Sequence, residues 1–237
     1  MNPIYQPKGA AKEYGEWALN IYTGCPHRCF YCYSPKFLRM DKETFHSHVE
    51  PRKDIVNAVR RQIEREGITG RLIHLCFTCD PYPVGYDTTP TREIIKILKE
   101  SGNHVQLLTK NAETRDFNLL DENDWFGVTI TGWHETSLKT EPNAATTTAR
   151  VCAAREAHER GIKTWLSCEP VIDCEAVFEL IKYGTQFDRI AIGKMNYFPS
   201  DIDWCKFGHE VEEICKALDR DYYIKDSLRA EMEKANV

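Results

Sequence analysis

The sequence predicts an α/β fold whose parallel sheet forms a partial (β/α)6 barrel, open along one side. Six short apolar runs alternate with six amphipathic stretches, and a chain that returns to a parallel neighbour needs a crossover helix each time. Polar or ionisable residues follow five of the six apolar runs, as expected where an active site lies at the carboxyl ends of strands. Periodicity alone leaves an open doubly wound sheet as the rival topology.

The six strand candidates are the short apolar runs themselves. In chain order they are Ala18–Tyr22, Arg71–Phe77, His104–Thr109, Trp125–Ile130, Lys163–Ser167 and Arg189–Ile192. The amphipathic stretches between them predict helices near Asp54–Arg65, Arg92–Glu100, Thr114–Leu120, Ala144–Glu159, Glu175–Lys182 and Val211–Leu218. The first of these helices places Ile55, Val59 and Ile63 on one buried stripe, and Gly67 follows it as a C′ residue.

No Pro/Gly/Ser-rich linker and no internal repeat divides the chain, so we expect a single domain over residues 1–237. A short C-terminal extension begins near residue 220. It contains Tyr222–Ile224 as a candidate extra strand and Ser227–Ala235 as a short polar helix.

Composition excludes several classes of protein. The 237 residues are 42% hydrophobic and 28% charged, which is not the composition of a disordered or collagen-like chain. No apolar run approaches the length of a membrane span, and the N-terminus lacks the pattern of a secretory signal, so we expect a cytoplasmic protein. The net charge of −5 argues against tight binding to duplex DNA, because such binding depends on Lys and Arg.

Ten cysteines are the outstanding feature of the composition. In a reducing cytosol they should be unpaired, so each is a ligand, a reactive thiol or a small core residue. Cys25, Cys29 and Cys32 crowd together with the spacing C-x3-C-x2-C. Three thiolates within eight residues can bind one metal centre. A structural zinc needs a fourth ligand, which His27 or a remote cysteine could supply, whereas an iron–sulfur cluster held by three cysteines keeps one iron open for chemistry.

The cysteine spacing, with Tyr31 before the last cysteine, resembles the signature of radical S-adenosylmethionine (SAM) enzymes. The wider context is similar to the spore photoproduct lyase branch, often called DNA repair photolyase-like. The similarity runs from Tyr22 through Tyr33 and continues in Thr78-Cys79-Asp80-Pro81-Tyr82 and Thr109-Lys110. Members of the family place the cysteine motif after strand 1 of a partial (β/α)6 barrel. The resemblance therefore implies that fold.

The resemblance also implies a 4Fe–4S cluster on Cys25, Cys29 and Cys32, with SAM chelating the open iron. One-electron reduction by a partner such as flavodoxin or ferredoxin would cleave SAM to a 5′-deoxyadenosyl radical, which abstracts hydrogen from a substrate. The radical chemistry belongs to the cofactor, and the protein supplies placement and exclusion of side reactions.

The resemblance further assigns residues to SAM. Tyr31 would pack against the adenine, and Lys110 would pair with the SAM carboxylate. Thr129 and Thr131 lie on one face of strand 4 because side chains alternate, and a hydroxyl there would bond the ribose.

Three more residues complete the predicted SAM site. Thr78 opens the motif after strand 2. Asp80 would meet the methionyl ammonium, although it could instead cap a turn. Glu169 would bond the ribose or the substrate, although a surface turn explains it equally well.

The chain departs from the spore lyase at the end of strand 2. That lyase has a hydrogen-donating cysteine where Phe77 stands here, and Cys79 takes the place of its serine. Cys76 and Cys79 should point to opposite faces if the strand runs that far. Cys79 and Cys168 stand at predicted rim positions and are the candidate hydrogen donors. The departure weakens the case for repair of a DNA photolesion.

We therefore expect a radical SAM enzyme of lyase or transferase type, acting on a small molecule, a peptide or a nucleotide. Two alternatives stay open. One is spore photoproduct lyase-like repair of a nucleic-acid lesion. The other is a non-catalytic zinc or iron–sulfur binding protein.

Overall fold

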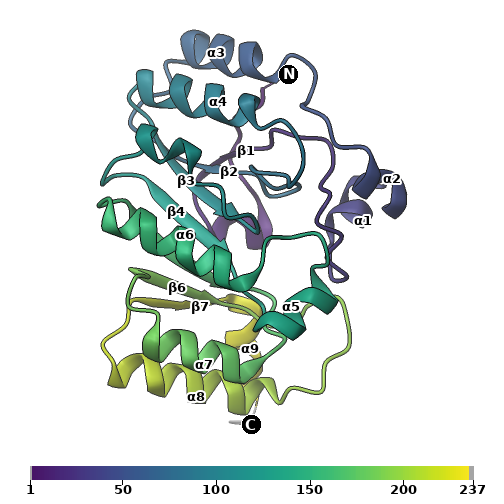
Figure 1. Ribbon diagram of the computed structural model, residues 1–237, viewed down its shortest axis with the longest axis vertical. Helices are drawn as coiled ribbons and strands as arrows, with labels where there is room; N and C mark the ends of the chain where they lie inside the picture. The colour runs from purple at the N-terminus through teal and green to yellow at the C-terminus, as the bar shows by residue number, and fades with distance from the viewer. Residues whose placement is uncertain (1, 235–237) are drawn as a thin grey trace.

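The sheet is all-parallel and its strands follow chain order from β1 to β7 (Figure 1). The computed structural model describes residues 2–234. Within them the strands are β1 Trp17–Leu19, β2 Leu72–Leu75, β3 His104–Thr109, β4 Trp125–Thr129, β5 Lys163–Cys168, β6 Arg189–Ile192 and β7 Tyr222–Ile224. A doubly wound sheet reverses its strand order at a switch point, so the sequential order excludes that topology and confirms the partial barrel.

Helices cover one face of the sheet, while α1 and α2 stand beside it (Figure 1). The α-helices are α1 Ser34–Leu38, α2 Lys42–Ser47, α3 Ile55–Glu66, α4 Thr89–Glu100, α5 His134–Thr140, α6 Thr147–Glu159, α7 Cys174–Tyr183, α8 Trp204–Ala217 and α9 Asp226–Lys234. Two 3-10 helices, η1 Gly9–Glu13 and η2 Arg115–Leu119, complete the described elements. Helix α4 contacts β3, and α6 contacts both β4 and β5.

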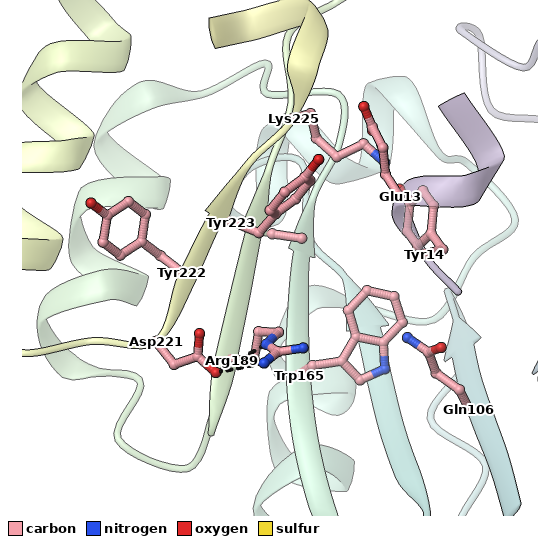
Figure 2. Close-up of a pocket in the computed structure, with 10 residues that line it drawn as sticks. Glu13, Tyr14, Gln106, Trp165, Arg189, Asp221, Tyr222, Tyr223 and Lys225 are labelled. Carbon is pink, nitrogen blue, oxygen red and sulfur yellow. Dashed lines mark hydrogen bonds and ion pairs between the residues drawn. The ribbon is translucent and has the colours of Figure 1, made fainter. Parts of the chain in front are cut away.

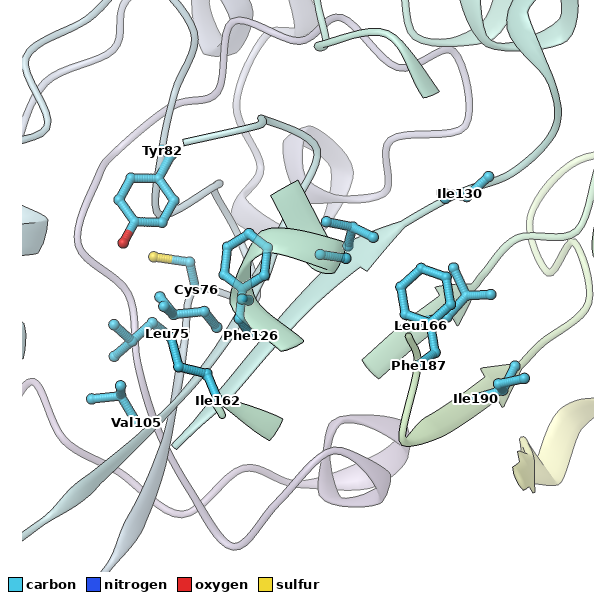
Figure 3. Packing of buried hydrophobic residues seen from close by; sticks show 14 of the residues in the cluster. Leu75, Cys76, Tyr82, Val105, Phe126, Ile130, Ile162, Leu166, Phe187 and Ile190 are labelled. Atoms are coloured by element: carbon cyan, nitrogen blue, oxygen red, sulfur yellow. The ribbon is translucent and has the colours of Figure 1, made fainter. Parts of the chain in front are cut away.

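The apolar core lies between these helices and the outer face of the sheet. Figure 3 shows Leu75, Val105, Phe126, Leu166 and Ile190 packed in one cluster along that face. All five are fully buried, and burying a side chain of this size stabilises the fold by about 1.5–3 kcal/mol. Because side chains alternate along a strand, the residues between them point to the concave side, where the site lies.

The first two strands are shorter than predicted, for a local reason. β1 ends at Leu19 because the side chain of Asn20 accepts hydrogen bonds from the N–H groups of Phe77 and Thr78, at 2.8 and 2.9 Å. The chain then leaves β2, and Tyr22 pairs instead with Pro51. β2 ends at Leu75, where Cys76 adopts a left-handed φ of 74°. A polar side chain thus replaces the strand ladder at the rim.

Several predicted helices also differ from the structure. The segment Thr114–Leu120 forms only the 3-10 helix η2, and α8 begins seven residues before Val211. The elements η1, α1, α2 and α5 were not predicted, because they are short and carry no long amphipathic pattern. The predicted extra strand is confirmed as β7, paired with β6. α9 ends at Lys234, and Ala235 of the predicted helix lies outside the described residues.

No helix among the described residues is long and apolar enough to cross a membrane.

The N-terminal segment bridges the two open edges of the sheet. Tyr5 pairs with Ala18 of β1, and Glu13 at the end of η1 forms an ion pair of 2.6 Å with Lys225, directly after β7. Between these contacts Tyr14 enters the concave side, where Figure 2 shows it near Trp165 and Lys225. The N-terminal segment therefore links the two edges of the partial barrel, because β1 and β7 do not hydrogen-bond to each other.

His74 of β2 makes the concave side sensitive to acid. It is 1% exposed, and burial, assisted by the charge of Lys225, lowers its pKa to about 3. In the unfolded chain the imidazole takes up a proton below about pH 6.5, whereas in the fold it stays neutral. Its contribution to stability is therefore complete above pH 6.5 and declines as the pH falls toward 3.

The free energy of unfolding should fall between pH 7 and pH 5, because His74 takes up a proton only in the unfolded chain. We predict that His74→Phe makes this fall smaller by about 2 kcal/mol, the amount expected from one such histidine. Urea unfolding at both pH values measures this difference. His134→Phe, at an exposed histidine, should leave the pH dependence as it is in the unaltered protein. An unaltered pH dependence in His74→Phe would contradict the prediction.

Candidate active site

The cysteine motif forms a loop after β1 that is held from two sides. On one side the N–H of Cys25 donates to the backbone oxygen of Phe45 in α2, at 3.2 Å. On the other, the Asn143 side chain donates to the carbonyl of Pro26 at 3.0 Å, and Phe30 donates to the carbonyl of Thr140. The loop is therefore fixed by α2 and by the segment that follows α5, neither of which was predicted.

Gly24, just before the first cysteine, is required by close packing. A side-chain carbon at this position would collide with the backbone oxygens of Phe45 and His48. Backbone atoms cannot give way as a flexible side chain can. Glycine therefore lets the cysteine loop lie directly against α2.

The three thiols of the loop are close enough to influence one another. Burial raises the pKa of Cys29 to about 12. Burial, with the charges of Asp80 and Cys29, raises the pKa of the Cys25 thiol well above its usual range. The sulfur atoms of Cys25, Cys29 and Cys32 do not all lie within 4.8 Å of one another. Sulfurs on a single tetrahedral zinc would be about 3.8 Å apart.

The carboxylate of Asp80 joins the loop to the ends of β2 and β3. One oxygen accepts from the Thr109 hydroxyl at 2.6 Å and from the N–H of Tyr82 at 2.8 Å. The other accepts from the N–H of Lys110 at 2.8 Å and faces Nδ1 of His27 at 3.5 Å. A carboxylate offers about four acceptor positions, and all four face protein groups here.

His27 is neutral in this arrangement. Burial lowers its pKa, and its Nε2 accepts a hydrogen bond from the N–H of Val84 at 3.3 Å. Nδ1 therefore carries the proton that faces Asp80. The neutral ring of His27 thus links the cysteine loop to Asp80 of the motif after β2.

Lys110 places a cation at the end of β3. Among the described residues its ammonium has no carboxylate partner within 4.0 Å, although it lies 5.6 Å from the centre of the Tyr31 ring. Burial would lower the pKa of Lys110, but the nearby Cys29 and Glu141 outweigh it, and the pKa is raised. The side chain is charged and can pair with an anionic ligand.

A buried ion pair that the sequence analysis missed lies behind Tyr31. Glu141 and Arg150 are 2.6 Å apart, and both side chains are fully buried. Arg150 also donates to the carbonyl of Thr129 at 2.7 Å, and the Tyr31 hydroxyl donates to Glu141. One signal was available, because Arg150 occupies the stripe of α6 that also carries the buried Ala153 and Ala157.

Comparison with known proteins identifies the family. A sequence model of the radical SAM superfamily matches residues 19–171, more than half of the chain. The chain belongs to the radical SAM superfamily. No curated protein matches the sequence.

Solved structures agree with the fold. Spore photoproduct lyase complexed with dinucleoside spore photoproduct has a TM-score of 0.70 and 13% identity, over 93% of this chain and 79% of that chain. A mutant of that lyase with bound AdoMet and dinucleoside spore photoproduct has a TM-score of 0.69, with the same identity and coverage. At 13% identity this likeness shows the fold alone.

The three predicted threonines are all buried at the rim of this radical SAM barrel. Thr129 ends β4, and its backbone oxygen is occupied by Arg150. The hydroxyl of Thr131 lies 3.4 Å from Glu141, and the hydroxyl of Thr78 lies 3.5 Å from the guanidinium of Arg52. Thr129 and Thr131 are therefore connected to the same buried ion pair.

Cys76 and Cys79 lie together, contrary to the expectation that they point apart. The strand ends at Leu75, and Cys76 adopts a left-handed φ of 74°, so the alternation of a strand does not extend to Cys79 and the two thiols influence each other's pKa. Burial would raise the pKa of Cys79, but hydrogen bonds from Cys76 and from the N–H of Tyr22 outweigh it and lower that pKa. Cys79 is the more acidic thiol of the pair.

Cys168 does not face the site. Its side chain is fully buried in the apolar cluster under the helices, so the expectation of a rim thiol is corrected for this residue. The alternation of β5 sends Cys168 outward and its neighbours Ser167 and Glu169 to the concave side. Glu169 accepts a hydrogen bond from the hydroxyl of Tyr14 and lies 3.5 Å from Lys225, so it is not a surface turn residue.

We predict that Glu141→Ala lowers the free energy of unfolding by about 3–5 kcal/mol, because it leaves the charge of Arg150 buried without a partner. Urea unfolding measures the loss, and the double variant Glu141→Ala/Arg150→Met should recover part of it. Glu156→Ala, which breaks the exposed pair with Arg160, should cost under about 1 kcal/mol. Equal losses of unfolding free energy in the Glu141 and Glu156 variants would show that the buried ion pair contributes no more to stability than the exposed one.

Proposed function

We propose that the protein reductively cleaves SAM at a 4Fe–4S cluster held by Cys25, Cys29 and Cys32, and uses the radical to abstract hydrogen from a substrate. The observation that carries the proposal is the position of Lys110. Its ammonium, which has no carboxylate partner within residues 2–234, lies over Tyr31 of the cysteine loop, so an anion-binding group stands beside a triad of thiols. When bound, the cluster and SAM supply the 5′-deoxyadenosyl radical.

The thiol triad fits such a cluster better than a single zinc ion. A closed structural zinc needs four ligands, and the loop offers three thiols, Cys25, Cys29 and Cys32. His27, the nearby alternative ligand, is occupied on both ring nitrogens by Val84 and Asp80. These contacts favour three cysteine ligands and an open position.

The residues of the chain would then divide the work of binding SAM. Lys110 would pair with the carboxylate of SAM, and Thr129 and Thr131 would offer hydroxyls to the ribose. We assign Asp80 a positioning role in place of the expected contact with the methionyl ammonium, because its oxygens already accept from Thr109 and from two backbone N–H groups. Thr78 would line the same rim.

Tyr31 and Glu169 receive modified assignments. The Tyr31 hydroxyl is occupied by Glu141, so only its ring remains to contact the adenine. Glu169 would contact the substrate from the concave side together with Tyr14. Cys79 would be the hydrogen donor, because it lies between Thr78 and Asp80 in the motif that follows β2, whereas Cys168 is buried in the apolar core.

The reaction would be of lyase or transferase type, with flavodoxin or ferredoxin as reductant and a small molecule, a peptide or a nucleotide as substrate. Tight binding to duplex DNA is not expected at a net charge of −5. Repair of a nucleic-acid lesion is the second candidate, because the similar lyase structures contain dinucleoside spore photoproduct.

We predict that reconstitution with iron and sulfide under anaerobic conditions gives a brown protein with absorbance near ~400 nm, as thiolate-bound iron–sulfur centres do. Cys25→Ala/Cys29→Ala/Cys32→Ala should bind no cluster by iron and sulfide analysis. Cys152→Ala, at an exposed cysteine, should reconstitute normally. A normal cluster in the triple variant would refute the assignment, and stoichiometric zinc in place of iron would favour the structural alternative.

We predict that Lys110→Ala weakens SAM binding about 10- to 100-fold, because a hydrogen bond to a charged group is worth about 1.5–3 kcal/mol. Equilibrium binding of SAM to the reconstituted protein measures this, with cluster content matched between samples. Lys182→Ala, on the exposed surface of α7, is the control and should bind SAM normally. Undiminished affinity in Lys110→Ala would remove this lysine from the SAM site.

A further inference from the structure

A groove opens beside the cysteine loop. Its volume is about 530 Å³. It is lined by Pro26, Arg28, His46, Ser47, Val84, Tyr86 and Asn143. None of these residues belongs to a strand of the sheet, so a molecule in the groove would contact the loop without entering the barrel.

One wall of the groove is continuous with the backbone of the proposed cluster ligands. The ring nitrogen Nδ1 of His46 donates to the carbonyl of Cys25 at 2.8 Å. Asn143 donates to the carbonyls of Pro26 and His27, at 3.0 and 3.3 Å. A partner seated here would therefore be separated from Cys25 by a single side chain.

The same histidine offers an unsatisfied acceptor. His46 is 4% exposed, and Nδ1 carries the proton because a carbonyl only accepts. Nε2 is then a lone-pair acceptor, and no donor reaches it within residues 2–234. Buried polar atoms are normally satisfied. His46 therefore lines the groove as a buried side chain whose described hydrogen bond is to the backbone of Cys25.

Next to the groove, α1 and α2 expose an aromatic side chain among basic ones. α1 packs against α2 and carries Phe37, whose side chain is 71% exposed, between the exposed Lys36 and Arg39. Tyr86 in the groove is 40% exposed. Aromatic residues and arginine are enriched in protein interfaces and supply many of their anchoring contacts.

The charge of this region is opposite to that of the whole chain. Residues 28–48 contain four basic and two acidic side chains, whereas the chain as a whole carries −5. Both acids are engaged, since Asp41 caps α2 at the N–H of Thr44 and Glu43 pairs with Arg28. Within the described part of the chain, the basic residues Lys36 and Lys42 form no ion pair.

We propose that this surface, formed by α1, α2 and the groove, docks the reductant, a small acidic protein that delivers single electrons. The proposal rests on the function proposed above. In the docked complex the reduced partner loses one electron and the cluster gains it, and no atom or proton is transferred. Opposite charge steers such partners to each other, and the exposed ring of Phe37 anchors the contact.

Comparing two reductants distinguishes an effect on docking from an effect on SAM cleavage. Reduced flavodoxin, an acidic flavoprotein, needs a docking surface, whereas dithionite is a small ion that does not. With the reconstituted protein, Lys36→Glu/Lys42→Glu should slow flavodoxin-driven SAM cleavage about 10- to 100-fold at low ionic strength and reduce its salt dependence. Phe37→Ala should weaken flavodoxin binding about tenfold. Neither variant should alter dithionite-driven cleavage.

Binding is measured directly as well, by titrating oxidised flavodoxin into the reconstituted protein. The matched controls lie on α7, where Lys182 adjoins Tyr183, whose side chain is 76% exposed. Lys182→Glu and Tyr183→Ala change the same kinds of side chain far from the cysteine loop. Both should leave flavodoxin binding and flavodoxin-driven cleavage at the level of the unaltered protein.

Slower cleavage with flavodoxin alone, together with weaker binding, supports the proposal. Equal effects with both reductants would place the surface in the SAM or substrate site and overturn the proposal, as would unchanged flavodoxin binding in both variants. If the unaltered protein cleaves no SAM with either reductant, the proposed function fails, and the binding titration still decides whether flavodoxin docks here.

Discussion

The site depends first on the carboxylate of Asp80, which holds three separate segments in one place. Its two oxygens accept from the strand-2 motif at Tyr82 and from the end of β3 at Thr109 and Lys110, and they face His27 of the cysteine loop. A buried carboxylate is costly unless its acceptor positions are filled, so the requirement to satisfy Asp80 also fixes the relative positions of these segments. The backbone of Lys110 is anchored by this contact, and its side chain is left free for an anion.

The buried pair of Glu141 and Arg150 has a different function in the same site. It supports Tyr31 from behind and holds the carbonyl at the end of β4. Such a pair contributes little net stability compared with apolar residues of the same volume, because both charges must leave water. The pair lies between the cysteine loop and β4. We infer that it fixes the position of the loop relative to that strand. The charged side chains around the site therefore divide into Asp80, Glu141 and Arg150, which are satisfied within the protein, and Lys110, which is not.

Sequence reasoning predicted the parts of the fold in which each residue is governed by its neighbours in the chain. The bounds of β3 and β6 are as predicted, because their alternation and flanking residues are local signals. β1 and β2 were too long because the side chain of Asn20 competes for backbone N–H groups more than fifty residues away. Cys25, Cys29, Cys32 and Lys110 could be placed from spacing and resemblance. Glu141 could not, since its contact with Tyr31 joins segments 110 residues apart, and Cys168 was assigned to the rim without regard to the face on which strand alternation places it.

The cysteine loop is positioned between two surfaces that meet different demands. Its inner side faces the concave end of the barrel, where Lys110 and Tyr31 lie and where, in the proposed function, water would be excluded from a reactive radical. Its other side rests on α2, whose close approach is permitted by Gly24. In the function proposed here, a substrate would enter the barrel to react, whereas an electron donor would need only to approach the loop. α1 and α2 do not cover the sheet and contribute little to the core, so their packing against the loop is better explained by the surface they present than by the stability of the barrel.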